Sequence, residues 1–186
     1  MLKEKDMLNR LFAKTDIYEL GELVRYNTRT KIKKQCVASH TAYVSQTILE
    51  ICTILNIDDE TTFKALKYGI IHDIPESKTC DIPYNVKKDI PFLNSVMKEA
   101  ELKVMEEYYP HLKEEFIKFT KAEEEEKIEG IIVKLADVVD VLRYSRREIL
   151  LGNKTEEMNN IYKDALYRTS IYTDKLLNKI QKVKKF

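Results

Sequence analysis

The chain has 186 residues, which fits a single domain over residues 1–186, and roughly 70% of its unfolded surface can be buried on folding. Hydrophobic residues make up 44% and charged residues 34%, a balance that excludes a disordered chain, and no apolar run approaches the ~20 residues of a membrane span. The net charge of +1 argues against a nucleic-acid duplex as partner, because duplex binders carry a clear basic excess.

The N-terminal segment is expected to form two short helices. Its first residues, MLKEKDMLNR, are charged and lack the apolar stretch of a secretory signal. Leucines 8 and 11 with Phe12, and then Leu20 with Leu23, indicate the two helices, and Thr15–Asp16 is a plausible N-cap between them. Residues 29–35 are basic and irregular, which predicts a loop.

Two longer helices follow. Apolar residues recur at helical spacing from about Val37 to Leu55, Asn56 ends this helix, and Asp58 can cap the next one. The second helix runs to about His72, because Pro75 disfavours helical continuation before it. Residues 73–84 are therefore predicted to form an ordered, polar loop.

The C-terminal half is also helical. Helical spacing covers residues 93–104 and, after a break at Pro110, a short amphipathic segment to about residue 119. The glutamate run at 123–126 favours a helix N-terminus, with solvated side chains, before the most apolar helix, at 128–142. Residues 155–183 indicate a last amphipathic helix. The fold class predicted is all-α, with about eight or more helices.

Glycine and cysteine usage excludes further classes. The four glycines are too far apart for a glycine-rich phosphate loop, so a phosphate ligand would need cationic side chains, a helix end or a metal ion. Three separated cysteines, Cys36, Cys52 and Cys80, form no disulfide framework, which suits a reducing cytoplasm.

Four residues combine metal-binding chemistry with apolar helical surroundings. His40 lies early in the first long helix, and His72 and Asp73 close the next one. Asp137 lies within the most apolar helix, where an ionised carboxylate is costly to bury unless Lys134 or a metal ion pairs with it. Two imidazole nitrogens and two carboxylate oxygens suit one divalent ion, and favour Co, Mn, Fe or Zn over Mg or Ca.

These residues resemble the H…HD…D pattern of the HD-domain superfamily of metal-dependent phosphohydrolases. The segments CVASHTAYVSQTILEI, GIIHDIPE and IVKLADVVD are similar to that superfamily's motifs, and the loop DIPYNVK is similar to its 5'-deoxynucleotidase branch. Glu148 with Gly152–Asn153 also fits that branch, and the resemblance covers roughly residues 8 to 155. It implies an HD-domain helical bundle, a homodimer, and removal of phosphate from deoxyribonucleoside 5'-monophosphates.

The resemblance also implies roles for residues around the ion. Glu76 would orient the attacking water or shuttle its proton, and Asp81 would contact the sugar or assist the water. Arg25 offers a planar, permanently charged fork for phosphate, and the adjacent Tyr26 would lie against the sugar. Further candidates for phosphate binding are Lys78 and Lys87.

The chain departs from the family pattern around the expected substrate pocket. Tyr26 stands in place of tryptophan, Ser39 of glutamate, Cys80 of glycine and Asn85 of proline. The metal set is intact, so these departures bear on which nucleotide is used. His111, the remaining histidine, is expected at a surface helix start, which leaves no histidine for a second ion.

Two alternatives stay open. A deoxynucleoside triphosphate hydrolase, releasing pyrophosphate or triphosphate, would need further cations near the ion. The candidates for those cations are Arg25, Arg29, Lys31, Lys33 and Lys34. A non-catalytic HD module that binds a ligand is the other alternative, although such modules commonly lose a metal ligand or the glutamate, and this chain keeps them all.

Overall fold

The computed structural model describes residues 18–82 and 90–183, together with Met7 and Val86. Across these residues the chain is helical, and one isolated antiparallel bridge joins Val24 to Cys36. The helices are α2 (Glu19–Glu22), α3 (Val37–Leu55), α4 (Asp59–Ile71), α5 (Glu76–Thr79), α7 (Pro91–Tyr108), α8 (Lys113–Glu124), α9 (Ile128–Leu150) and α10 (Glu156–Val183). The predicted all-α class is confirmed. No helix in the described part of the chain is both long and apolar enough to cross a bilayer.

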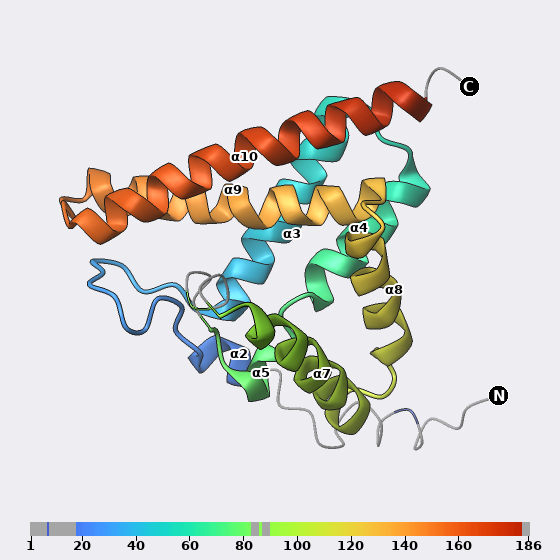
Figure 1. The fold of residues 1–186 in the computed structure, drawn as a ribbon, viewed down its shortest axis with the longest axis horizontal. Coiled ribbons are helices and arrows are strands. Elements are labelled where there is room, and N and C mark those ends of the chain that lie inside the picture. The colour runs from blue at the N-terminus through green and yellow to red at the C-terminus, as the bar shows by residue number, and fades with distance from the viewer. Residues whose placement is uncertain (1–6, 8–17, 83–85, 87–89, 184–186) are drawn as a thin grey trace.

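Helix α9 is the centre of the molecule. It packs against α3, α4, α8 and α10, and Figure 1 shows α10 lying along it. Its apolar stripe is buried, as its periodicity predicts. The buried apolar residues of this stripe are Ile131, Ile132, Val133, Leu135, Ala136 and Val138.

The junction between α3 and α4 follows the sequence signals closely. Asn56 ends α3 in the left-handed conformation, with φ 51°, and the Ile57 N–H donates to Cys52 O at 3.0 Å. Asp58 then caps α4, since its side chain accepts the Thr61 N–H at 2.9 Å. This tight connection lets α4 return along α3, so that the end of α4 arrives beside the beginning of α3.

The junction between α8 and α9 corrects one prediction. Glu123 and Glu124 are the last residues of α8 and do not begin a helix. The chain reverses at Glu126, which has φ 49°, and the Lys127 N–H donates to Ala122 O at 2.9 Å. This hydrogen bond closes α8, so the glutamate run marks a helix C-terminus despite its unfavourable charge there.

Gly130 makes this junction possible. A Cβ atom on Gly130 would lie 2.5 Å from the carbonyl oxygen of Ala122, which is backbone and cannot rotate away. The first turn of α9 therefore packs directly on the end of α8. This approach brings Glu123 next to α9, where its carboxylate lies 2.9 Å from the Lys134 ammonium, so Glu123 is not the solvated side chain that was predicted.

Two other predicted segments differ or fall outside the described residues. The predicted loop at 73–84 contains the single helical turn α5, and residues 83–85 are outside the described part. Of the two N-terminal helices, α2 is present as one turn, with Leu20 buried. The first predicted helix and its Thr15–Asp16 cap lie outside the described residues. The predicted basic loop at 29–35 is present.

Candidate metal centre

The predicted metal ligands come from three helices that meet at one point. His40 lies in the first turns of α3, His72 is the C-cap of α4 with Asp73 directly after it, and Asp137 lies in the middle of α9. The tight α3–α4 connection brings His72 to His40, and the packing of α3 on α9 brings Asp137 to both. The imidazole rings of His40 and His72 have centroids 5.4 Å apart.

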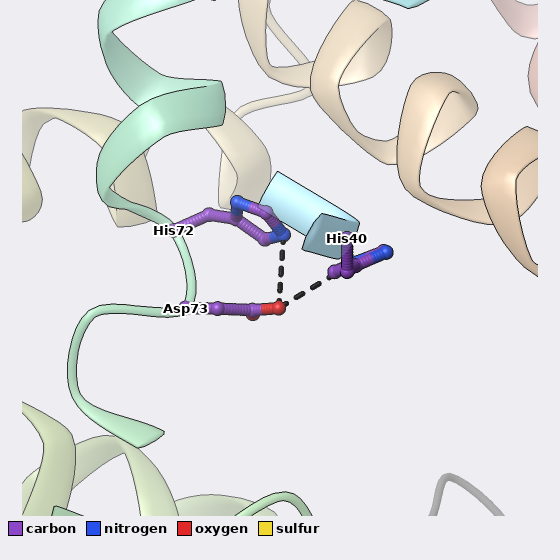
Figure 2. A group of neighbouring side chains, drawn as sticks. All are labelled: His40, His72 and Asp73. Carbon is purple, nitrogen blue, oxygen red and sulfur yellow. Dashed lines mark ion pairs between the residues drawn. The ribbon is translucent and has the colours of Figure 1, made fainter. Parts of the chain in front are cut away.

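The ligand atoms converge on a small volume. Figure 2 shows the Asp73 carboxylate between the two imidazoles, with Oδ2 3.4 Å from His40 Nε2 and 3.2 Å from His72 Nε2. One ligand atom from each of these three residues lies within 4.8 Å of the others. Asp137 Oδ1 lies 3.3 Å from His40 Nε2, which adds the fourth predicted ligand to the same cluster.

The two imidazoles are held in the tautomer that a metal ion requires. His72 Nδ1 lies 2.7 Å from Gly69 O, which can only accept, so Nδ1 carries a proton and Nε2 is the nitrogen left to bind an ion. His40 Nδ1 lies 2.6 Å from Asp140 Oδ2, and the same reasoning applies. Both Nε2 atoms are buried without a hydrogen-bond partner. Buried polar atoms of this kind are rare, and a divalent ion between them would satisfy both.

Charge in the cluster favours ionised carboxylates. Burial alone would raise the pKa of Asp137, but His40, Arg25 and His72 outweigh it and hold that pKa far below the ordinary value. Burial alone would lower the pKa of His72, but Asp73 outweighs it and raises this pKa to about 9. The carboxylates are thus ready to bind a cation, and a proton on His72 holds that position when no ion does.

Arg25 brings a buried guanidinium to the same place. Its segment is fixed by the hydrogen bond from the Arg25 N–H to Gln35 O at 2.9 Å. Its Nη1 lies 3.6 Å from Asp140 Oδ2 and its Nε lies 3.9 Å from Asp81 Oδ2, both beyond hydrogen-bond distance. Nε and Nη1 are buried without a hydrogen-bond partner. These donors remain available to an anion at the cluster.

A cleft of about 670 Å³ opens from the cluster towards α7, α8 and α10. The predicted site residues that line it are Arg25, His72, Asp73, Glu76, Asp81 and Asp137. Its other wall has an apolar part and a polar part. The apolar residues are Met97, Phe116, Phe119, Val133, Val141 and Tyr172, and the charged residues are Lys98, Glu101, Glu123, Lys134 and Arg168. The cleft therefore offers both an ion site and an apolar surface for a flat ring.

Two predicted substrate residues, Tyr26 and Lys78, are not among the residues that line this cleft. Tyr26 has φ 54°, and its ring stacks on Tyr144, with centroids 4.8 Å apart and planes within 1°. Its ring lies 5.5 Å from the Arg25 guanidinium carbon. Lys78 lies in α5, and its ammonium group is 2.6 Å from a Glu19 carboxylate oxygen. Lys87 lies outside the described residues.

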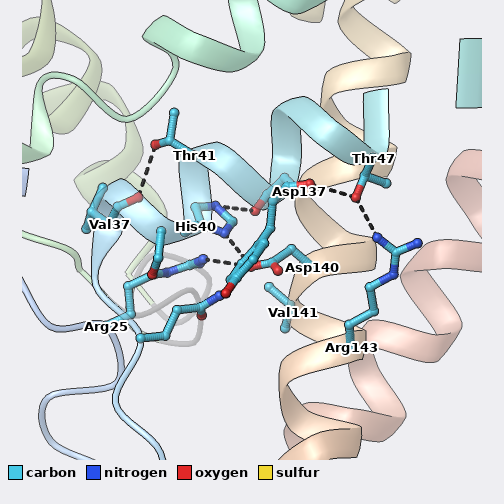
Figure 3. Close-up of polar contacts among 12 residues, drawn as sticks. Arg25, Val37, His40, Thr41, Thr47, Asp137, Asp140, Val141 and Arg143 are labelled. Carbon is cyan, nitrogen blue, oxygen red and sulfur yellow. Dashed lines mark hydrogen bonds and ion pairs between the residues drawn. The ribbon is translucent and has the colours of Figure 1, made fainter. Parts of the chain in front are cut away.

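Sequence reasoning missed Asp140 and Gln35. Figure 3 shows Asp140 beside His40 and Arg25, and its Oδ2 also accepts a hydrogen bond from Gln35 Nε2 at 2.8 Å. Asp140 is only 3% exposed and lies one turn after Asp137 on α9. A second carboxylate on the buried face of the most apolar helix was the signal that could have identified it.

A second buried carboxylate fixes the loop that carries Arg25 and Gln35. Glu148 is fully buried, and its two oxygens accept the N–H groups of Ile32 and Lys33, each at 2.7 Å. Asn153 donates to Glu148 at 3.0 Å and to Thr30 O at 2.9 Å. Glu148 and Asn153, which fit the last motif of the family pattern, therefore hold the basic loop against α9.

The described helices bring two histidines and two aspartates together, and their fold is that of solved HD-domain proteins. A family model described as "5'-deoxynucleotidase YfbR-like" matches residues 12–181. The chain belongs to the YfbR-like 5'-deoxynucleotidase family. A search of curated protein sequences finds no match.

Solved structures with the same fold include three informative relatives. A protein of Pyrococcus horikoshii OT3 shares 21% identity with a TM-score of 0.69, over 94% of this chain and 98% of that one. An HD phosphohydrolase of cyanophage S-2L, bound to dA and one catalytic Zn²⁺ ion, shares 16% identity with a TM-score of 0.69, over 92% and 98%. An HD-domain phosphohydrolase of Listeria innocua shares 22% identity with a TM-score of 0.66, over 88% and 84%.

Proposed function

We propose that this hydrolase removes the phosphate group from deoxyribonucleoside 5'-monophosphates, with one divalent ion held by His40, His72, Asp73 and Asp137. The observation that carries the proposal is the convergence of the buried Nε2 atoms of His40 and His72 on the carboxylates of Asp73 and Asp137, at 3.2 to 3.4 Å. The two carboxylates lie close to His40 Nε2 and line the start of the cleft. The donors of Arg25 line the same cleft.

The donor set fits one borderline divalent ion. Two imidazole nitrogens with two carboxylate oxygens favour Zn, Co, Mn or Fe, whereas Mg prefers an all-oxygen shell. The cyanophage relative holds one catalytic Zn²⁺, which supports a single ion here too. An ion with four protein ligands keeps open positions, where it can polarise a phosphate oxygen and make bound water acidic near neutral pH.

The chain's own residues would bind phosphate and move protons. Arg25 can donate two hydrogen bonds to phosphate oxygens from Nε and Nη1, which have no other acceptor. Asp81, 3.9 Å from Arg25, would help to orient that guanidinium as well as contact the sugar or water. Glu76 lines the cleft beside the metal ligands, where a carboxylate can accept the proton of the attacking water.

The distribution of cations favours monophosphates over triphosphates. Of the five cations that sequence reasoning offered to a longer phosphate tail, Arg25 lines the cleft. Arg29 pairs with Glu157, and the Lys31 ammonium donates to Tyr26 O at 2.7 Å. The remaining two lysines lie at another surface.

The cations of the outer cleft are engaged with carboxylates. Lys98 lies 2.7 Å from Glu124 and Lys134 lies 2.9 Å from Glu123. Arg25 alone combines buried, unpartnered donors with a place beside the ion cluster, within the described residues. One available guanidinium can bind one phosphate group, which favours a monophosphate substrate.

A deoxyribose preference is the finer part of the proposal. It is supported by the family description and by the relative that binds dA. The Tyr26 ring does not line the cleft but lies 5.5 Å from the Arg25 guanidinium carbon, so we propose that it acts on the sugar from beside the phosphate held by Arg25. The homodimer that the resemblance implies stays a prediction.

The test is phosphate release by purified protein supplied with Mn²⁺, Co²⁺ or Zn²⁺. We expect inorganic phosphate from dAMP, dGMP, dCMP and dTMP, with much lower kcat/KM for the triphosphates. Pyrophosphate or triphosphate release from deoxynucleoside triphosphates, without turnover of the monophosphates, would instead favour the triphosphate hydrolase.

A further inference from the structure

A second hollow of about 290 Å³ lies between α3 and α9, and we call it the α3–α9 groove. None of its lining residues lines the catalytic cleft. Its buried floor is formed by Gln35, Asp140 and Tyr144, and its exposed rim includes Lys33, Lys34 and Arg147. The groove therefore reaches α9 at Asp140, whereas the cleft reaches it at Asp137, one turn earlier.

The rim of the groove is strongly cationic. Lys33, Lys34, Arg143 and Arg147 line it, against one carboxylate, Asp140. Arg143 is held by Thr47 at 2.8 Å and Glu50 at 2.7 Å. The other three cations have no carboxylate within ion-pair distance among the residues that the structure describes.

The one carboxylate of the groove is already engaged within the protein. Asp140 Oδ2 lies 2.6 Å from His40 Nδ1, 2.8 Å from Gln35 Nε2 and 3.6 Å from the Arg25 guanidinium. Its negative charge is therefore compensated within the protein. An anion at the rim would meet three cations that form no direct ion pair, and little repulsion from the floor.

The cations are attached to a fixed backbone. The Lys33 N–H donates to Glu148 at 2.7 Å, and the Lys33 carbonyl accepts the Tyr144 hydroxyl at 2.8 Å. Both partners belong to α9, so the loop does not need to order itself when a ligand binds. Lys33 and Lys34 are thus presented in one place.

The floor contains an acceptor without a partner. Gln35 is 6% exposed, and its Oε1 is buried without a hydrogen bond, whereas its Nε2 is bonded to Asp140. A buried amide oxygen in this state is unfavourable, and a water that donates to it and to a phosphate oxygen would stabilise it. Tyr43, an exposed aromatic ring at the rim, could stack on a base.

We propose that the α3–α9 groove is a second anion site that binds an oligophosphate, separate from the catalytic cleft and independent of the proposed function. The oligophosphate could be the tail of a nucleoside di- or triphosphate or a free oligophosphate. Its phosphate oxygens are bound by Lys33, Lys34 and Arg147. Asp140 forms the wall between this site and His40.

The test measures the affinity of the metal-loaded protein for two probes by calorimetry, with the free divalent ion held constant. The probes are tripolyphosphate and a non-hydrolysable dATP analogue. Lys33→Gln/Lys34→Gln should weaken the binding of tripolyphosphate at least about tenfold, which is 1.4 kcal/mol. Arg147→Gln provides an independent second variant with the same expected direction.

The matched control is Lys64→Gln/Lys118→Gln, which removes the same charge from exposed sites on α4 and α8. It should bind both probes as the wild type does. Equal affinities for the groove variant and this control would overturn the proposal. A loss of binding in Arg25→Gln with none in the groove variants would also overturn it, because it would place the anion in the cleft.

A further variant separates the two sources of the oligophosphate. If Tyr43→Ala weakens the dATP analogue and leaves tripolyphosphate unchanged, a nucleotide occupies the groove. If both probes bind alike and Tyr43→Ala changes neither, the groove takes a free oligophosphate. Either result supports an oligophosphate site at Lys33, Lys34 and Arg147.

Discussion

Asp140 Oδ2 lies 2.6 Å from His40 Nδ1, so that a fully buried histidine is oriented by a buried carboxylate one turn after Asp137. This contact fixes the His40 ring with Nε2 towards Asp73 and Asp137. A carboxylate in this position also makes the imidazole a stronger ligand. Asp140 is therefore a positioning residue for the metal cluster, although it is not one of the four predicted ligands.

The first prediction concerns this contact. Asp140→Asn should weaken the affinity for Mn²⁺ or Zn²⁺ about 10- to 100-fold, because the neutral amide still orients His40 but no longer strengthens it as a ligand. Metal titration measures the affinity, and thermal unfolding of the metal-free protein checks the fold. Asp174→Asn, at an exposed position on α10, is the control. An unchanged affinity in Asp140→Asn would show that the contact is structural only.

The second prediction concerns the sugar. A flat ring near C2' leaves a 2'-hydroxyl unpaired, which costs ~1–3 kcal/mol, or roughly 5- to 150-fold in kcat/KM. The wild type should therefore prefer dAMP to AMP, and Tyr26→Ala should reduce this preference. Equal kcat/KM for both nucleotides in the wild type would refute the idea. A preference that survives Tyr26→Ala would place the discrimination at another residue.

The third prediction concerns the α8–α9 junction. Gly130→Ala should lower the free energy of unfolding by about 1–3 kcal/mol, because its Cβ would lie 2.5 Å from a backbone carbonyl oxygen. Gly21→Ala is the matched control, since nothing lies within 4 Å of a Cβ there. Urea unfolding of both variants measures the difference. Equal stabilities would mean that the junction can shift without cost.

The fourth prediction concerns the pH dependence of stability. Burial alone would raise the pKa of Glu148, but hydrogen bonds from Asn153, Ile32 and Lys33 outweigh it and lower this pKa. A lowered pKa in the folded state stabilises the protein above the unfolded pKa, and the contribution disappears as pH falls through the folded value. Glu148→Gln should therefore be less stable than wild type by about 1.5–3 kcal/mol at pH 7.

This difference should shrink as the pH falls below the ordinary glutamate pKa of about 4.5. Urea unfolding of both proteins between pH 7 and pH 3 measures it. A difference that is constant over this range would mean that the charge of Glu148 is irrelevant, and that only the shape of its side chain holds the loop.

Local signals predicted much of the fold. Asn56 and Asp58 act over a few residues, and the structure places a helix end and a helix cap there, as their chemistry predicts. The prediction that the glutamate run at 123–126 marks a helix N-terminus was wrong, because a tertiary contact decides where α8 ends. Gly130 lets α9 approach Ala122, and neither the glycine's role nor the Glu123–Lys134 pair can be read from charge alone.

The candidate site shows the same division. His40, His72, Asp73 and Asp137 were found from residue type, spacing and family resemblance, and the structure brings all four together. The residues that orient them were not found. Gln35 and Asp140 meet across 105 positions, so only the packing of the basic loop on α9 reveals their contact. The stacking of Tyr26 on Tyr144 likewise depends on that packing.

The most direct test of the account compares metal content and turnover of dAMP in wild type, His72→Ala and Glu76→Ala. We predict that wild type binds one equivalent of ion, and that His72→Ala loses both ion and activity. Glu76→Ala should keep its ion and lose about 10²-fold or more in kcat, because it handles a proton and does not bind the ion. A His72→Ala protein with a full equivalent of ion and wild-type turnover would contradict the central claim.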